Sequence, residues 1–316
     1  MTGINQGTPE AAIGEPIRLG SNNEFEIEQH PVSDRLIIRD TVNGKVAYIR
    51  AERGGQIGGD GVLVKALKEG KPMADDGRTY DTIQQAERAA SSWVFVPPGT
   101  FTENPTITTD GLTLRGSGYN TLIDGQQIDH ALTNKADNVT IENLSVRTGG
   151  SSNNKNGITN SADDVLINSV TVREAGELGI RCDEGDDTNN VTVVNCTIGP
   201  HHEQGISPSN SGGVVVGNIV SMGEKHGIHQ NGTPGAIIAN NIVDGTSSAS
   251  NANGIRGEGD SILVGNRIIS ASEDGIKMTV GASIIANNRI SDSGNSDIDD
   301  NGTGTVLDAN LTGASN

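Results

Sequence analysis

The sequence predicts an all-β protein built as a parallel β-helix, in which the chain winds into stacked coils. Between Gly157 and Ile298 a Gly-Ile pair (once Asp-Ile) recurs, and each pair opens a short β-branched run. The isoleucines of these pairs are Ile158, Ile180, Ile206, Ile228, Ile255, Ile276 and Ile298. They lie 21 to 27 residues apart with no helical pattern between them, which is typical of a solenoid repeat.

Ahead of the repeat, residues 1–72 predict a separate small β domain. The run 25–29 alternates as a strand does, and the β-rich runs 35–41 and 45–51 flank Asn43-Gly44, a strong hairpin signal. Residues 1–75 hold 11 acids and 9 bases. A nearly neutral surface suits docking, so we expect residues 1–72 to anchor the chain to other proteins and to mediate homo-oligomer formation.

Residues 73–92 predict a linker and a capping helix. Asp81 stands at the N-cap and Gln84 at the reciprocal position of a capping box. The apolar positions of this helix share one face: Ile83, Ala86 and Ala90. Such a helix would cover the open first coil of a β-helix that spans residues 93–316, where unpaired strand edges invite aggregation.

Residues 93–125 carry a more specific pattern. A helix followed by VFVPPGTF and LTLRGSG resembles the start of pectin-lyase-like β-helix domains, and later coils such as GI…VTVVNCTI resemble the repeat of that superfamily. The resemblance covers roughly residues 76–310 and implies a right-handed, single-stranded parallel β-helix. The layout of the whole chain, with RLIIRDTVNGKVAYIRA ahead of the coils, also resembles surface proteins of haloarchaeal tailed viruses, which form capsid turrets or tail fibres.

The composition indicates a protein that works in concentrated salt. The net charge is −18, and residues 76–316 hold 29 acids against 13 bases. The bases are 14 Arg and only 8 Lys, and 33% of the residues are hydrophobic. In brine the Debye length shrinks to about 3 Å, so self-repulsion matters little. The alternative is an ordinary acidic extracellular protein. A nucleic-acid partner is not expected, because phosphate binding needs a basic face.

Targeting and redox signals are few. The N-terminus has neither a basic region nor an apolar stretch, so we expect no signal peptide, and no apolar run is long enough to span a membrane. Release by host lysis, as part of a virion exposed to brine, would explain an extracellular location. Cys182 and Cys196 are too few for a disulfide framework and carry no predicted function. No cofactor is expected, apart from cations bound from concentrated salt.

A recurrent asparagine predicts an internal ladder. It stands near the end of the β-branched run in seven coils, as Asn143, Asn168, Asn195, Asn218, Asn241, Asn266 and Asn288. Stacked coils lie about 4.8 Å apart, so such side chains can hydrogen-bond along the rod.

One outward row carries the candidate binding residues. Because the isoleucine of each pair points inward, its successor points outward. This row holds three cations and a histidine, and its members are Arg181, Ser207, His229, Arg256, Lys277 and Asp299. Our hypothesis is a shallow polar groove that binds an acidic glycan, because Arg binds carboxylate or sulfate in bidentate fashion. The glycan-binding candidates are Arg181, His229, Arg256, Lys277, Asp183 and Glu258. Alternatively, Arg181 pairs with Asp183 and Arg256 with Glu258, and these pairs only balance charge.

Catalytic and metal-binding signals are weaker. Lys225-His226-Gly227-Ile228 resembles the histidine motif of polygalacturonase-like members of the superfamily with its first glycine replaced. An enzyme would combine it with a nearby acidic turn, so the alternative catalytic set is His226, Asp183, Asp186 and Asp187. Histidines from two coils offer an alternative metal-binding set, namely His202, Glu203, His226 and His229, although their spacing matches no known metal motif.

The sequence therefore favours a non-enzymatic surface protein of a halophilic virus, a capsid turret or spike. Residues 1–72 would anchor it to other virion proteins, and the β-helix would contact host surface glycans. The first alternative is a tailspike-type glycoside hydrolase or polysaccharide lyase. The others are a tail-fibre adhesin and a cell-associated adhesin.

Overall fold

The structure, a computed structural model, describes most of the chain in several stretches. These are residues 17–19, 25–29, 35–40, 46–50, 60–148, 154–182, 188–208, 211–221, 223–231, 236–245 and 252–313. The chain divides into two compact units, Met1–Glu69 and Gly70–Asn316.

The first unit contains an antiparallel sheet and a helix. The strands follow the order β1 (Ile17–Leu19), β2 (Phe25–Gln29), β3 (Arg35–Asp40) and β4 (Val46–Arg50). Strands β3 and β4 pair as the hairpin signal predicts, while the Asn43-Gly44 turn lies outside the described residues. Helix α1 (Asp60–Glu69) was not predicted, because the glycine-rich stretch that leads into it is typical of a connecting segment. The anchoring role of this unit stays a prediction.

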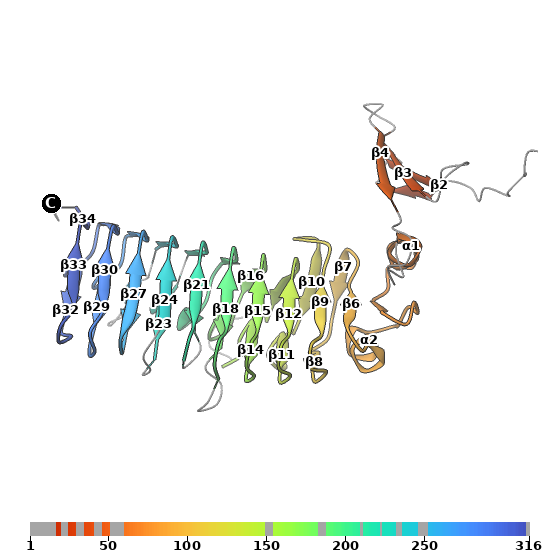
Figure 1. Cartoon of the computed structure of the whole chain (residues 1–316). Coiled ribbons are helices and arrows are strands. Elements are labelled where there is room, and N and C mark those ends of the chain that lie inside the picture. Colours follow the sequence, from red (N-terminus) through yellow and green to blue (C-terminus); the bar gives the residue numbers. More distant parts are fainter. Residues whose placement is uncertain are drawn as a thin grey trace, which may run out of the picture. The chain divides into compact units, whose positions relative to one another are not determined.

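The second unit is a right-handed parallel β-helix with three long sheets, as predicted (Figure 1). The first sheet contains β5 (Met73–Ala74), β6 (Trp93–Phe95), β9 (Thr113–Arg115), β12 (Thr140–Glu142), β15 (Leu166–Asn168), β18 (Thr192–Val194), β21 (Val214–Val216), β24 (Ala236–Ala239), β27 (Ser261–Val264), β30 (Ile284–Ala286) and β33 (Val306–Asp308). The second contains β7 (Gly99–Phe101), β10 (Thr121–Asp124), β13 (Ser145–Arg147), β16 (Thr171–Glu174), β19 (Thr197–Ile198), β22 (Ile219–Ser221), β25 (Ile242–Asp244), β28 (Arg267–Ile269), β31 (Arg289–Ser291) and β34 (Leu311–Thr312). The third contains β8 (Thr106–Ile107), β11 (Leu132–Asn134), β14 (Ile158–Asn160), β17 (Ile180–Arg181), β20 (Gln204–Ser207), β23 (His226–Gln230), β26 (Ile255–Gly257), β29 (Ile276–Met278) and β32 (Ile298–Asp300).

The recurrent Gly-Ile pair marks the tightest point of each coil. The isoleucine lies in a strand of the third sheet and is fully buried, as at Ile206 and Ile228. A Cβ atom added to Gly205 would lie 2.3 Å from Cγ1 of Val220 and 2.6 Å from the carbonyl oxygen of Gly227 on the next coil. Any side chain there would separate the stacked backbones, so the repeat requires glycine.

Helix α2 (Ile83–Ala89) lies at the β6 end of the β-helix (Figure 1). Its start differs from the prediction by one residue. Thr82, not Asp81, is the N-cap, and its hydroxyl accepts a hydrogen bond from the Gln85 amide at 3.1 Å. The Glu103 carboxylate accepts from the amides of Ile83 and Gln84 at 2.8 and 3.1 Å, a long-range cap that a local motif cannot reveal. All three predicted face residues, Ile83, Ala86 and Ala90, are buried.

The asparagine ladder exists, but it begins only at Asn218 and does not extend into the first coils. Its members are Asn218, Asn241, Asn266, Asn288 and Asn310. Asn143 and Asn195 instead hold positive-φ turn positions one residue earlier, at 54° in both cases. Apolar residues fill the ladder column in these coils, as Leu144, Val170 and Cys196. The prediction was therefore wrong for Asn143, Asn168 and Asn195, because adjacent turn and ladder positions both favour asparagine.

Two further expectations concern the core and the membrane. Cys182 and Cys196 are both buried and do not form a disulfide with each other, and burial raises the pKa of the Cys196 thiol to about 12. Across the part of the chain that the structure describes, no helix is long and apolar enough to cross a membrane.

We expect replacement of one ladder asparagine to cost far more than replacement of its neighbour in the turn. Asn266 Nδ2 donates to the carbonyl of Ile238 at 2.8 Å and to Oδ1 of Asn288 at 3.0 Å, and its own Oδ1 accepts from the Asn241 amide at 3.0 Å. Asn266→Ala would leave these groups buried and unsatisfied, at a cost of about 3 kcal/mol in the free energy of unfolding. Chemical denaturation measures this loss.

The matched control is Asn287→Gly. Asn287 has φ of 55°, and glycine already holds the equivalent position as Gly265, at 68°. Its replacement should cost less than about 1 kcal/mol. Equal losses for the two variants would contradict the ladder's role.

Candidate functional site

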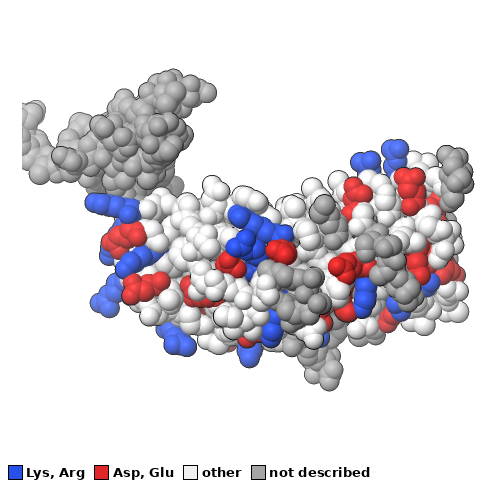
Figure 2. All heavy atoms as spheres, turned by 180° about the vertical axis from the view of Figure 1, so that it is seen from behind, with Lys and Arg blue, Asp and Glu red and all other residues white. Residues whose placement is uncertain are grey.

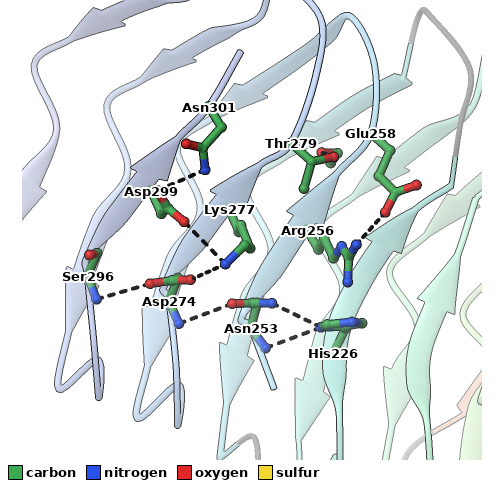
Figure 3. A network of polar contacts seen from close by, with 11 residues as sticks. His226, Asn253, Arg256, Glu258, Asp274, Lys277, Thr279, Ser296, Asp299 and Asn301 are labelled. Atoms are coloured by element: carbon green, nitrogen blue, oxygen red, sulfur yellow. Dashed lines mark hydrogen bonds and ion pairs between the residues drawn. The ribbon is translucent and has the colours of Figure 1, made fainter. Parts of the chain in front are cut away.

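Four candidate residues lie in one row of the third sheet, in which Arg256, Lys277 and Asp299 are partly exposed while His229, contrary to the prediction, is buried. His229 of β23 is aligned with Arg256 of β26, and Arg256 with Lys277 of β29. Lys277 is in turn aligned with Asp299 of β32. The row therefore crosses four successive coils, and Figure 3 shows three of its members. This arrangement follows from the parallel stacking, which places equivalent residues of each coil directly above one another.

Each cation of this row is paired with acids of the same protein (Figure 3). Arg256 Nη2 lies 2.6 Å from Glu258 Oε1. Lys277 Nζ lies 3.0 Å from Asp274 Oδ2 and 3.2 Å from Asp299 Oδ2. The side chains of Arg256 and Lys277 remain 26% and 25% exposed. The pairing that we considered as an alternative to glycan binding thus exists for Arg256, although both pairs stay accessible from outside.

Beneath the ion pairs runs a buried polar column. It consists of three residues that each precede a Gly-Ile pair, His226, Asn253 and Asp274, and it ends at the exposed Ser296, which precedes Asp297-Ile298. The Asn253 amide donates to Nδ1 of His226 at 3.2 Å, and the Asp274 amide donates to Oδ1 of Asn253 at 3.1 Å. Asp274 is only 3% exposed, so its carboxylate depends on Lys277 for charge compensation. The column therefore supports the outer row (Figure 3).

His226 is held in the neutral form. Burial, with smaller contributions from His229 and nearby cations, lowers the pKa of His226 to about 3. Burial likewise lowers the pKa of His201, which is 3% exposed. The rings of His226 and His229 lie 4.8 Å apart between centroids and are tilted by 57°. A base whose pKa lies so far below 7 is poorly matched to proton transfer at neutral pH.

The alternative metal-binding set is not assembled. His202 Nδ1 pairs with Glu224 at 2.5 Å, and Glu203 pairs with Lys225 on the next coil. His226 lies instead in the buried column. Within the described stretches, no group of three or more His, Cys, Asp or Glu residues is placed to hold a metal ion.

The structure describes Arg181 but not its proposed partner Asp183. Arg181 of β17 is partly exposed and aligned with Ser207 of β20, so it continues the outward row. Its proposed partner Asp183, together with the alternative catalytic residues Asp186 and Asp187, lies outside the described residues. The alternative catalytic set therefore stays a prediction.

Sequence reasoning missed the polar column at the position before Gly-Ile. The backbone amide of each later coil donates to the side chain of the coil before it. Gln230, 1% exposed, accepts a hydrogen bond from Ser261 on the first sheet, and this contact between sheets was also missed. The available signal was the polar residue before the glycine at Gln204, His226, Asn253 and Asp274.

The site is close to neutral despite the acidity of the chain. Arg256 and Lys277 face Glu258, Asp274 and Asp299, so two cations offset two of the three anions and one negative charge remains. Figure 2, which views the molecule from behind, likewise shows acidic and basic side chains next to one another along the β-helix. Such a surface can donate and accept hydrogen bonds, but it offers no strong field for a polyanion.

Comparisons with known proteins establish the fold. The A-module of a mannuronan C-5 epimerase from Azotobacter vinelandii is 18% identical to this chain, with a TM-score of 0.62, and the match covers 77% of this chain and 76% of the epimerase chain. The ORF18 protein of Geobacillus virus E2 is 13% identical, with a TM-score of 0.55, and the match covers 94% of this chain and 70% of the viral chain. A pectate lyase is 15% identical, with a TM-score of 0.52, and the match covers 67% of this chain and 65% of the lyase chain. No family model and no curated protein match the sequence. The predicted pectin-lyase-like fold is confirmed.

Removal of Lys277 should destabilise the β-helix through Asp274. We expect Lys277→Met to cost about 2 kcal/mol in the free energy of unfolding, because a carboxylate that is 4% exposed loses its counter-charge. Adding Asp274→Asn should recover most of this loss, since the amide keeps the oxygen that accepts from Ser296 at 3.1 Å. Chemical denaturation of both variants tests this. A double variant no more stable than Lys277→Met would contradict the pairing.

Stability should fall in mild acid because of the buried histidines. His226 has a pKa of about 3 when folded and of 6.5 in its ordinary state, so only the unfolded chain binds the proton between these values. Stability is therefore complete above about pH 6.5 and declines as the pH falls toward about 3.

The variant that tests this is His226→Asn. Asparagine already holds the equivalent position on the next coil as Asn253, and its oxygen can accept the same amide. It should flatten the stability profile between about pH 6.5 and 5, with His201 supplying the remaining slope. This window lies above the range in which carboxylates titrate. An unchanged profile would show that His226 is not held neutral.

Proposed function

We propose that this chain is a surface protein of a virion, a turret or spike, whose β-helix contacts host surface glycans in concentrated salt without cleaving them. The observation that supports the glycan contact is the row from His229 to Asp299. Its paired cations, Arg256 and Lys277, are each about a quarter exposed, and they lie above the buried polar column. Rigid polar groups at fixed spacing are suited to a repeating polymer, because each additional sugar meets an equivalent position.

The charge of the row favours a neutral, hydroxyl-rich glycan over an acidic one. Each cation already has a carboxylate partner, so an acidic sugar would have to compete with Glu258, Asp274 or Asp299. Sugar hydroxyls can instead donate to these carboxylates and accept from the remaining N–H groups of the cations. This argument revises the acidic ligand that the sequence alone suggested. The bound carbohydrate would lie across successive coils, along the rod.

The virion role is supported by the extent of one similarity. The epimerase covers 77% of the chain, about the share of the second unit, whereas the viral ORF18 protein covers 94%. The latter match must therefore reach into the first unit as well. The strongly acidic composition of the β-helix supports the proposal that the protein works in concentrated salt. We propose that the first unit docks on other virion proteins and brings copies of the chain together.

The main alternative is a tailspike-type hydrolase or lyase. Two of the similar structures are those of a mannuronan C-5 epimerase and a pectate lyase. Against this alternative stands the low pKa of His226, which leaves it a weak base at neutral pH. A tail-fibre adhesin would use the same row and differ only in where the first unit attaches.

A binding experiment with size analysis separates these functions. The full chain is mixed in multimolar salt with neutral and with sulfated polysaccharides, and the products are sized by chromatography. We expect neutral polysaccharide to co-elute with the protein at full length. Shortened polysaccharide would overturn the non-enzymatic proposal. If the neutral and the sulfated polysaccharide both stay free of the protein, the proposed glycan contact is overturned.

The matched variants test the location of binding. Arg181→Ala with Arg256→Ala should weaken binding about tenfold, equivalent to about 1.4 kcal/mol. Arg115→Ala is the control, since Arg115 of the first sheet is 61% exposed and also pairs with an acid, Glu142. Equal effects of the two changes would place binding elsewhere.

A further inference from the structure

The outer surface of the first sheet becomes apolar from β18 onward. Its strands contribute two aligned outward columns. The first column contains Thr192, Val214, Ile237, Ile262, Ile284 and Val306. The second contains Val194, Val216, Ala239, Val264 and Ala286 and ends at Asp308 of β33. Apart from Asp308 at the end of the second column, none of these side chains is charged, and we call this surface the apolar face (β18 to β33 in Figure 1).

The apolar face is not explained by the packing of the β-helix itself. Ile237, Ile262 and Ile284 are 39%, 41% and 45% exposed, while the core is filled by alternate residues such as Ile238 and Leu263. In two earlier strands of the same sheet, β9 and β12, the equivalent outward position is held by threonine, as Thr113 and Thr140, a polar residue that also favours β-strands. The outer surfaces of the other two sheets carry charged residues in the same coils. A contiguous apolar patch on so acidic a chain marks a contact surface.

We propose that the apolar face packs against the same face of a second copy, with the two β-helices parallel. Sheets pack face to face at about 10 Å, and the columns repeat at about 4.8 Å along the rod. Two copies share this repeat, so their columns stay in register over the whole length. An unrelated partner has no reason to match it.

The sizes of the side chains match in the parallel arrangement. The two columns lie two residues apart along each strand, about 7 Å. Consider a two-fold axis that lies between the two packed faces, runs parallel to the rods and is midway between the columns. This axis places the first column of one copy opposite the second column of the other. Ile237 then meets Ala239 of the second copy, and Ile284 meets Ala286. Large residues opposite small ones are what close sheet packing requires.

Charges at the two margins favour the same arrangement. Asp260 lies exposed just before β27 at one margin. Arg267 and Arg289 lie exposed and aligned just past the turn at the other margin, and neither has an ion-pair partner among the described residues. Parallel copies bring the arginine margin of one molecule to the Asp260 margin of the other. Antiparallel copies would bring arginine to arginine, which costs energy.

The size and charge of the surface predict how the dimer responds to salt. The apolar face extends for about 24 Å along the rod, which corresponds to a contact at the lower end of stable interfaces. A net charge of −18 on each copy opposes association when it is unscreened. Concentrated salt screens this repulsion, and strongly hydrated salts strengthen apolar contact. The dimer should therefore form in brine and dissociate as salt is lowered.

Sedimentation velocity on the full chain tests the interface, with circular dichroism to verify folding at each salt concentration. We expect a dimer in multimolar salt, and Ile262→Glu should raise its dissociation constant at least about tenfold. Ile128→Glu is the control, because Ile128 is 72% exposed and lies away from the apolar face. A wild-type chain that stays monomeric in brine would overturn the proposal. So would an oligomer that Ile262→Glu leaves unchanged, since its contacts would lie elsewhere.

A charge reversal tests the orientation. Arg267→Glu should weaken the parallel dimer, and adding Asp260→Lys should restore it, because the two margins exchange signs. Tighter association of Arg267→Glu alone would indicate antiparallel copies and would overturn the parallel arrangement.

Discussion

The close stacking of one coil on the next determines the rest of this structure. Backbone hydrogen bonds join each strand to the equivalent strand of the following coil, and the glycine of each Gly-Ile pair lets the two backbones approach. Once this contact is made, every position of a coil is repeated above and below. The buried asparagines, the polar column that contains His226 and the apolar face are all consequences of that repetition, since each is one position of the coil seen over several turns.

Repetition also decides how this β-helix can bury polar groups. Each ladder asparagine accepts from the coil before it and donates to the coil after it, so its amide is satisfied only while both neighbours are present. The first coils fill the same position with Leu144, Val170 and Cys196 and need no such partners. The column beneath the proposed binding row follows the same rule with mixed chemistry, because His226, Asn253 and Asp274 each offer an acceptor to the next backbone amide. This explains how an acid and a neutral histidine can share one buried column.

The sequence alone predicted the β-helix, because the Gly-Ile pair reports directly on the closest backbone approach and therefore recurs. It also identified the row from Arg181 to Asp299, since alternation along a strand fixes which face a residue lies on, but neighbouring residues bury two of its members, Ser207 and His229. The ladder was misplaced by one or two residues at Asn143, Asn168 and Asn195, because a positive-φ turn position and a buried ladder position both favour asparagine. The cap of α2 by Glu103 and the contact between Ser261 and Gln230 join distant segments, so no local pattern could reveal them. The apolar face escaped notice because a β-branched outward residue looks the same in sequence as an inward one.

The direction of the backbone hydrogen bonds has a mechanical consequence. In all three sheets these bonds run between coils, so they lie along the axis of the β-helix. A pulling force applied along that axis loads only the outermost coil, whose strands would peel away before the next coil bears any load. Each peeled coil of 21 to 27 residues would release about 70 to 90 Å of chain. Extension would then proceed in a sawtooth of similar steps, which would let the β-helix dissipate a sudden pull instead of detaching as a whole.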